Sequence, residues 1–169
     1  MNDFWKKLEE DKLGALSSPS GGVDEVSTAW IRFVCEAMEI DCPLHYDRDT
    51  AIAHGYKDVV APPFFATIAS IEPYWQPGQE PMGEKPISPG IYATELGVPS
   101  VNGFVTDVTL ICGEPIYPGE HISRQSVLTK VYPKKLRIAD GAFLTVQDKM
   151  TGADGSEKAT FEYVTFLGI

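Results

Sequence analysis

Apolar residues in the first half of the chain recur at the spacing of an α-helix. From Trp30 to Met38 they fall three or four positions apart, which gathers them on one helical face. Ser27 or Thr28 can cap the N-terminus of this helix, and Pro43 cannot continue it. The pattern therefore predicts an amphipathic helix that packs against a core.

Two further helices are predicted downstream. Asp47 can cap a short helix over Arg48–His54, and Gly55 suits its C-terminal stop. Pro62 and Pro63 suit the first positions of the next helix, because their missing N–H groups would have no partner there. Its continuation, residues 64–71, is almost wholly apolar. A helix that is hydrophobic on every side is expected to be buried, so other parts of the chain must surround it.

The second half of the chain alternates with the period-two pattern of β-strands and is rich in Val, Thr and aromatic residues. The predicted strands are Phe104–Ile111, Ile122–Val131, Ala142–Asp148 and Ala159–Leu167, and Tyr92–Val98 is a candidate for one more. Turn signals lie at residues 113–120 and at Asp154-Gly155. Helices followed by an antiparallel meander predict an α+β fold, in which a curled sheet of about five strands wraps the buried helix.

The remaining segments are predicted from composition. Residues 3–13 favour a helix that docks through Phe4 and Trp5, and residues 16–22 (LSSPSGG) are typical of a flexible connector. We therefore expect an N-terminal extension and linker over residues 1–22 and a single domain over residues 23–169. The Pro- and Gly-rich stretch 76–90 is expected to be a loop, either a lid at a pocket or a tolerated insertion.

Charge and cysteine content narrow the function classes. The formal net charge of −10 argues against a nucleic-acid partner and an anionic membrane surface. No run of about 18 apolar residues is present, and the N-terminus has no signal-peptide pattern, so a cytoplasmic protein is expected. Cys35, Cys42 and Cys112 are odd in number and irregularly spaced, which predicts neither a disulfide framework nor a metal site.

Residues 36–65 (EAMEIDCPLHYDRDTAIAHGYKDVVAPPFF) combine a helix, a turn with Asp41 and His45, and an Ala-Pro-Pro-Phe helix start. This combination resembles the N-terminal, FAS1-type dehydratase half-domain of MaoC-like dehydratases, a branch of the hot-dog superfamily. The family turn has the form Asp-x-Asn-Pro-x-His. The YPGE sequence at residues 117–120 is similar to the family's Pro-Gly-Asp turn. The resemblance extends over roughly residues 23–167 and implies a hot-dog fold.

The resemblance implies reversible addition of water to a trans-2-enoyl-CoA or an enoyl carrier-protein thioester. A carboxylate and a histidine would position and deprotonate the water, and a backbone N–H would stabilise the thioester oxygen. His45 and Asp41 are the candidate catalytic residues. The competing interpretations are a structural histidine bonded to Asp47 or to a nearby carbonyl, and an Asx-type turn at Asp41.

This chain departs from the family pattern at two points. With His45 on the family histidine, the family aspartate falls on Ile40, and Asp41 comes one residue late. Pro62 stands at the helix start and has no N–H to donate. The resemblance therefore implies a subunit that shapes the acyl pocket, paired in a dimer or a tetramer with a hot-dog chain that carries the intact catalytic set. The predicted pocket residues are Ala61, Pro62, Pro63, Phe64 and Phe65.

The densest basic stretch consists of Lys130, Lys134, Lys135 and Arg137. It is either a binding site for CoA phosphates or for an acidic carrier protein, or simply a solvated hairpin end. No cofactor is expected beyond the CoA or carrier portion of the substrate.

Three alternatives remain open at this point. The chain could be a self-sufficient homodimeric (R)-specific enoyl-CoA hydratase that uses His45, or a non-enzymatic module that binds acyl thioesters. A thioesterase would need an acid on the buried helix, and residues 64–71 contain none. Fatty, branched, aromatic and steroid side-chain thioesters are all compatible with the sequence.

Overall fold

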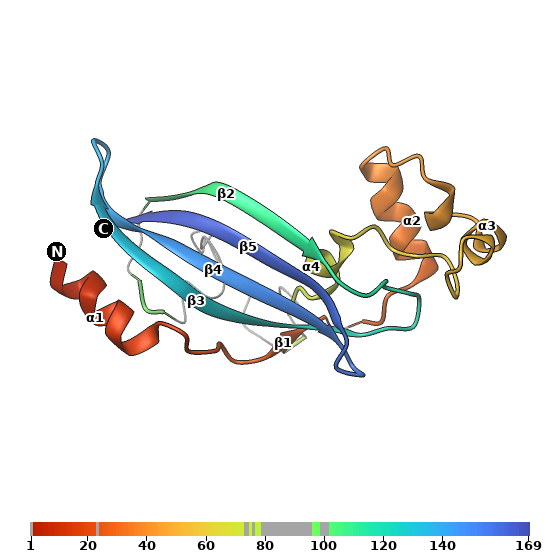
Figure 1. Cartoon of the computed structure of the whole chain (residues 1–169), viewed down its shortest axis with the longest axis horizontal. Coiled ribbons are helices and arrows are strands. Elements are labelled where there is room, and N and C mark those ends of the chain that lie inside the picture. The colour runs from red at the N-terminus through yellow and green to blue at the C-terminus, as the bar shows by residue number, and fades with distance from the viewer. Residues whose placement is uncertain (1, 23, 73–74, 76, 79–95, 99–101) are drawn as a thin grey trace.

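The computed structural model describes residues 2–22, 24–72, 75, 77–78, 96–98 and 102–169. Within these residues the chain forms a five-stranded antiparallel sheet in the order β1-β3-β4-β5-β2 (Figure 1). The strands are β1 (Ser20–Gly21), β2 (Asn102–Cys112), β3 (Ile122–Lys135), β4 (Asp140–Gly152) and β5 (Glu157–Gly168). The long strands confirm the predicted antiparallel meander.

The helices lie at the two ends of this sheet. They are α1 (Asn2–Lys12), α2 (Thr28–Ala37), the 3₁₀ helix η1 (Pro43–His45), α3 (Arg48–Ala53) and α4 (Phe65–Ala69). Figure 1 shows α1 beside β3, with α2 and α3 beyond the opposite end of the sheet and α4 next to that end. No helix of the described segments is long and apolar enough to cross a membrane.

Alternation along the strands separates a buried face from an outer face. In β4, Ala142, Leu144 and Val146 are buried, whereas the intervening residues are half-buried. The predicted turn at Asp154-Gly155 is confirmed, since Gly155 has a φ of 83°. The turn between β3 and β4, at residues 136–139, lies at the basic stretch that was interpreted as a possible hairpin end, although LRIA contains neither glycine nor proline.

Two hydrophobic clusters fill the buried face of the described residues. The first lies where α2 and α4 meet the sheet, and includes Ile31, Phe65 and Met150. The second lies beneath α1, where the fully buried Trp5 contacts a group of strand residues. That group is Leu128, Val131, Ala142, Leu144, Val146 and Leu167.

The expectation of a flexible connector at residues 16–22 was wrong. Ser17 N donates to Ser126 O at 2.8 Å, and Gly14 N donates to Leu128 O at 2.9 Å. β1 continues this pairing along β3. The small side chains of the connector let it lie extended against the edge of β3, so the N-terminal segment completes the sheet rather than tethering a separate unit.

The apolar helix is shorter and less enclosed than predicted. α4 spans five residues, with Phe65, Ala66 and Ala69 buried, but Ile71 is 52% exposed. The helix ends at Ser70, whose φ of −95° and ψ of 6° depart from helical values. Most of the predicted loop at residues 76–90 and of the candidate strand at residues 92–98 falls outside the described residues.

A buried carboxylate separates the two clusters. Asp148 on β4 is 5% exposed, accepts a hydrogen bond from Ser126 Oγ at 2.5 Å, and lies 3.8 Å from Arg124. Burial raises the pKa of Asp148, although the Ser126 hydrogen bond and the Arg124 charge oppose the shift. A raised carboxyl pKa means that Asp148 binds its proton more tightly in the folded state than in the unfolded chain.

Replacing Asp148 with asparagine tests this effect on stability. Because the folded pKa lies above the ordinary value near 3.8, the free energy of unfolding falls as pH rises from that value through the folded pKa. Asparagine resembles the protonated acid and does not titrate. We expect Asp148→Asn to gain stability over the native chain between pH 3.5 and pH 7, measured by urea unfolding at both pH values. If the variant's gain in the free energy of unfolding were equal at the two pH values, or larger at pH 3.5 than at pH 7, the raised pKa of Asp148 would be contradicted.

Candidate functional site

Local capping places His45 between two helices. Ser27 accepts a hydrogen bond from Trp30 N at 3.1 Å and begins α2, as predicted. Asp47 begins α3 by accepting from Asp49 N at 3.0 Å and Thr50 Oγ1 at 2.8 Å. His45 ends the 3₁₀ turn η1 between these helices and is only 8% exposed.

The imidazole of His45 is oriented by the backbone of the following loop. His45 Nδ1 lies 2.5 Å from Val60 O, and because a carbonyl can only accept, Nδ1 must carry the hydrogen. In the neutral ring Nε2 is then left with its lone pair. This is the nearby-carbonyl contact that the structural interpretation of His45 required, and it also leaves Nε2 able to accept a proton.

His45 lines a cavity of about 300 Å³, which is at the lower end of the range for small-molecule sites. One wall comes from the His45 turn and the start of α4, and the other from the end of β2, the following loop and β5. The lining residues are Leu44, His45, Tyr56, Val60, Ala61, Pro63, Cys112, Gly113, Glu114, Pro115, Ile116 and Lys158.

Asp41 is not brought into this cavity. It is exposed, and it is absent from the lining residues, whereas His45 is buried among them. Glu39, two residues earlier, has a φ of 53°, in the left-handed region that redirects the chain. The structure therefore separates the two predicted catalytic residues.

The predicted pocket residues at the start of α4 have different environments. Ala61 and Pro63 line the cavity, whereas Pro62 is buried and is not among the lining residues. Phe65 is fully buried in the first cluster, where its ring meets Trp30 edge-on at 5.1 Å, while Phe64 is half-buried. Ala61 N donates to Ile116 O at 2.9 Å, so its N–H is already engaged.

Lys158 and Glu114 line the cavity but were missed by the sequence reasoning. The Lys158 side chain is 5% exposed; its Nζ lies 2.8 Å from Glu120 Oε2 and donates to Pro115 O at 3.0 Å. Glu114 supplies the carboxylate among the lining residues. Neither position carried a signal, because Lys158 falls in a polar strand start and Glu114 in a turn.

A second, more polar cavity of about 490 Å³ adjoins the first and shares Tyr56, Glu114, Pro115 and Lys158 with it. Lys57 lies over the ring of Tyr117 at 5.4 Å on its wall. No group of three or more His, Cys, Asp or Glu side chains within the described ranges could hold a metal ion.

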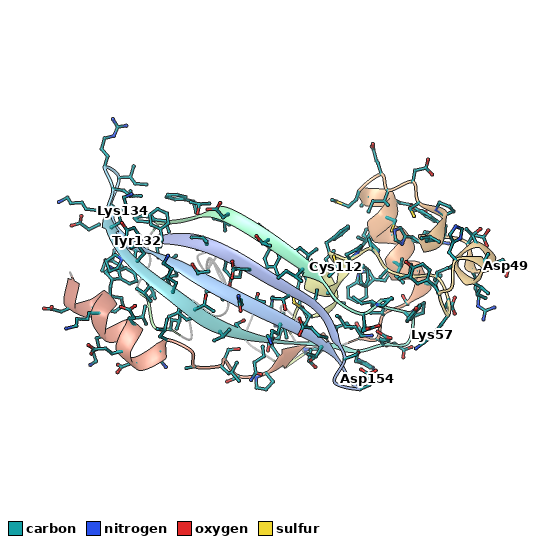
Figure 2. The ribbon with its side chains drawn as sticks, in the orientation of Figure 1. Asp49, Lys57, Cys112, Tyr132, Lys134 and Asp154 are labelled. Carbon is teal, nitrogen blue, oxygen red and sulfur yellow. The ribbon has the colours of Figure 1, made fainter. Side chains whose placement is uncertain are left out.

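The predicted basic cluster lies far from His45 in this chain. Lys130, Lys134 and Lys135 are on β3 and Arg137 is in the turn that follows. Figure 2 shows Lys134 at one end of the sheet and Cys112, which lines the cavity, at the other. Lys135 pairs with Asp140 at 3.6 Å. The four bases therefore cannot serve a ligand in this chain's own cavity.

A family model described as "FAS1-like, dehydratase domain region" matches residues 16–161. The chain belongs to this family. This confirms the relationship that the His45 turn and the Ala-Pro-Pro-Phe motif predicted.

A curated relative from Thermomonospora curvata, named as a probable enoyl-CoA hydratase alpha subunit, is 30% identical over 147 residues. The match covers 85% of this chain and 45% of that protein, so the chain spans about half of the length of this relative.

Two solved structures share the fold. The ChsH1-ChsH2 complex from Mycobacterium tuberculosis matches with a TM-score of 0.77 and 21% identity, covering 99% of this chain and 97% of that one. The C-terminally truncated HadBC (3R-hydroxyacyl-ACP dehydratase) complex from Mycobacterium tuberculosis matches with a TM-score of 0.63 and 18% identity, covering 94% and 98%. At such identities the likeness is one of fold, and it confirms the predicted hot-dog architecture.

Proposed function

We propose that this chain is a subunit of an enoyl-thioester hydratase or dehydratase, which adds water reversibly to a trans-2-enoyl-CoA or enoyl carrier-protein thioester. We further propose that it associates through β2 with a second hot-dog chain. The observation that carries the proposal is an apolar edge strand, β2, which pairs on one side only among the described strands and ends at the His45 cavity.

The two edges of the sheet differ sharply. The β3 edge is covered by the N-terminal segment, whereas β2 pairs only with β5 among the described strands. Apolar side chains along β2 are exposed: Phe104 by 41%, Val105 by 52%, Val108 by 57% and Ile111 by 56%. A long apolar edge strand is a template for pairing with another chain.

The open edge runs directly to the cavity. Cys112 ends β2 and lines the same cavity as His45. A strand added to β2 would therefore place the partner at the cavity rim, so that a thioester would lie at the boundary of two subunits. The relationship to an enoyl-CoA hydratase alpha subunit and the likeness to two hot-dog complexes support this arrangement.

Within such a pair this chain shapes the acyl pocket and its partner performs the chemistry. Asp41 lies outside the cavity, and the N–H of Ala61 is already bonded, so this chain does not present the family's water-activating pair and helix-start donor. The space that this chain itself offers to an acyl tail is the cavity of about 300 Å³ lined by Ala61 and Pro63. The reaction needs no cofactor beyond the thioester's own CoA or carrier.

A cytoplasmic location fits this proposal. Cys35, Cys42 and Cys112 are all free thiols, which is typical of a reducing compartment.

Hydration of crotonyl-CoA by the chain alone and by its assembly with a neighbouring MaoC-like chain tests the role of His45. We expect activity only in the assembly, and a loss of less than about tenfold on His45→Ala, against the roughly 100- to 10,000-fold typical of removing a general base. The absorbance of the enoyl thioester reports the reaction.

Other outcomes would select another function. Strong activity of the chain alone that is abolished by His45→Ala would identify a self-sufficient homodimer. Glu114→Gln would then test whether the carboxylate that lines the cavity acts with His45. Thioester binding without turnover in every pairing would identify a non-enzymatic binding module.

A further inference from the structure

We propose that the basic hairpin of this chain binds the 3′-phosphorylated ADP portion of CoA whose thioester occupies the partner's catalytic cavity. The basic hairpin is defined as Lys130, Tyr132, Lys134, Lys135 and Arg137. This inference rests on the proposed assembly through β2, and it names the substrate portion that this subunit recognises.

The hairpin is basic, although the chain as a whole is acidic. The chain has 14 basic and 24 acidic residues. Residues 129–139 nevertheless contain four bases and no acid. Among the ion pairs of the described residues, the hairpin contributes one, in which the exposed Lys135 meets the half-buried Asp140 at 3.6 Å. Lys130, Lys134 and Arg137 form no pair there. A local positive field of this kind attracts phosphate.

Three side chains of the hairpin, those of Lys130, Tyr132 and Lys134, share a face that suits a nucleotide, and Arg137 lies in the turn beyond them. Lys130, Tyr132 and Lys134 pair with Thr145, Phe143 and Gly141 respectively, so they alternate onto one face of the sheet. That face is the outer one, opposite the second cluster, which contains Val131 and Leu144. Tyr132 is 52% exposed between the two lysines. An exposed ring flanked by ammonium groups can stack with adenine while the lysines neutralise phosphates.

The hairpin is too distant to serve the cavity of its own chain. Along β4, Asp140 at the hairpin and Met150 beside the cavity end are ten residues apart, which corresponds to about 34 Å at roughly 3.4 Å per residue. Figure 2 places Tyr132 and Lys134 together at one end and Lys57 and Cys112 at the other. A ligand of the hairpin must therefore reach a different cavity.

Pairing through β2 supplies that cavity. Two edge strands related by a two-fold axis perpendicular to the sheet run antiparallel, so the start of one faces the end of the other. The start of β2 lies in the hairpin's part of the sheet, because Asn102 pairs with Gly168, which pairs with Gly141. The end of β2 leads to the cavity. The hairpin of one subunit thus lies at the same end of the joint sheet as the other subunit's cavity.

The lateral spacing fits the length of CoA. β4 and β3 are two and three strands from β2 in the sheet order. The partner's edge strand adds one more step, which gives roughly 14 to 19 Å at about 4.8 Å per strand. In CoA the pantetheine arm and the pyrophosphate separate the thioester from the 3′-phosphate by a comparable span. The hairpin therefore meets the nucleotide and not the reacting carbons.

The test compares two double variants of equal charge change in the assembled enzyme. Lys134→Ala/Arg137→Ala removes two hairpin bases, and Lys12→Ala/Lys149→Ala removes two exposed bases elsewhere. We expect the first to raise the KM for crotonyl-CoA about tenfold, the size expected when two exposed charge contacts with phosphate are lost. Its kcat, the KM for crotonyl-pantetheine and all constants of the control should stay unchanged.

Several results would overturn the assignment. They are an unchanged KM for crotonyl-CoA, an equal rise for crotonyl-pantetheine, and a rise confined to crotonyl carrier protein, which would indicate a protein-docking surface instead.

Calorimetry with CoA itself separates this inference from the proposed reaction. CoA binding that weakens about tenfold in the hairpin variant, without hydration in any pairing, would keep the nucleotide site and reject the hydratase. Equal CoA affinity of the assembly and of a dissociated Val108→Lys chain would reject a site acting across subunits.

Discussion

Replacing Val108 with lysine is expected to abolish the assembly and, with it, hydration of an enoyl thioester. Val108 lies in the middle of β2 and is 57% exposed, so the isolated chain should lose no more than about 0.5 kcal/mol of stability. In the assembly the new ammonium would be buried without a partner at the junction of the two sheets. That cost weakens association by at least about 100-fold, as measured by analytical ultracentrifugation across a concentration series.

The opposite edge supplies the matched control for this prediction. Leu16 is 63% exposed and bridges to Val127 at the covered β3 edge. Leu16→Lys therefore makes the same chemical change where no partner strand is expected, and should leave assembly and hydration intact. Unaltered association of Val108→Lys would show that β2 is not the interface, and the proposed shared cavity would lose its basis.

Local chemistry predicted the region around His45 well. Ser27 and Asp47 cap helices because their side chains accept the N–H groups of the first helical turn, and this depends on neighbours in sequence. Gly55 ends α3 with a φ of 89°, a conformation that glycine adopts without strain. Such features are encoded within a few residues, so a single sequence suffices to predict them.

Long-range pairing set the limit of what the sequence could predict. The serine- and glycine-rich residues 16–22 have no strand propensity of their own. They are held extended by the backbone groups of β3 and by the side chains of Gln125 and Ser17. Lys158 is similar, since its burial results from Glu120 and the Pro115 carbonyl, which approach from another part of the chain. Composition favours exposure for both segments, and the tertiary structure overrides it.

The position of Asp41 shows a third limit. Its spacing from His45 was known, but the direction of its side chain depends on the backbone angles of the turn between them. The left-handed conformation at Glu39, an unusual one for a non-glycine residue, leads into this turn. When the spacing between the aspartate and the histidine is one residue shorter than in the family turn, the histidine can therefore remain in the cavity while the carboxylate faces solvent.

Removing the Trp5 side chain is expected to produce the largest loss of stability. Trp5 is fully buried, with 0% of its surface exposed, and lies in the second cluster with Leu128 and Leu144. Trp5→Ala should cost about 3–5 kcal/mol, the range for truncating a buried aromatic residue. Urea unfolding would measure this loss, provided that the slope m of the unfolding free energy against urea concentration is the same for both proteins. The family match begins at residue 16, so α1 precedes the matched region and yet completes the core.

Phenylalanine at the same position separates packing from the need for the indole N–H. Trp5 Nε1 is buried and finds no hydrogen-bond acceptor among the described residues, and burying a donor in this way costs about 1–3 kcal/mol. Trp5→Phe removes that cost while leaving a smaller cavity, so its stability should stay within about 1 kcal/mol of the native chain. A Trp5→Ala loss below about 1 kcal/mol would mean that α1 is only loosely docked. The buried face of β3 and β4 would then depend on other parts of the chain for its cover.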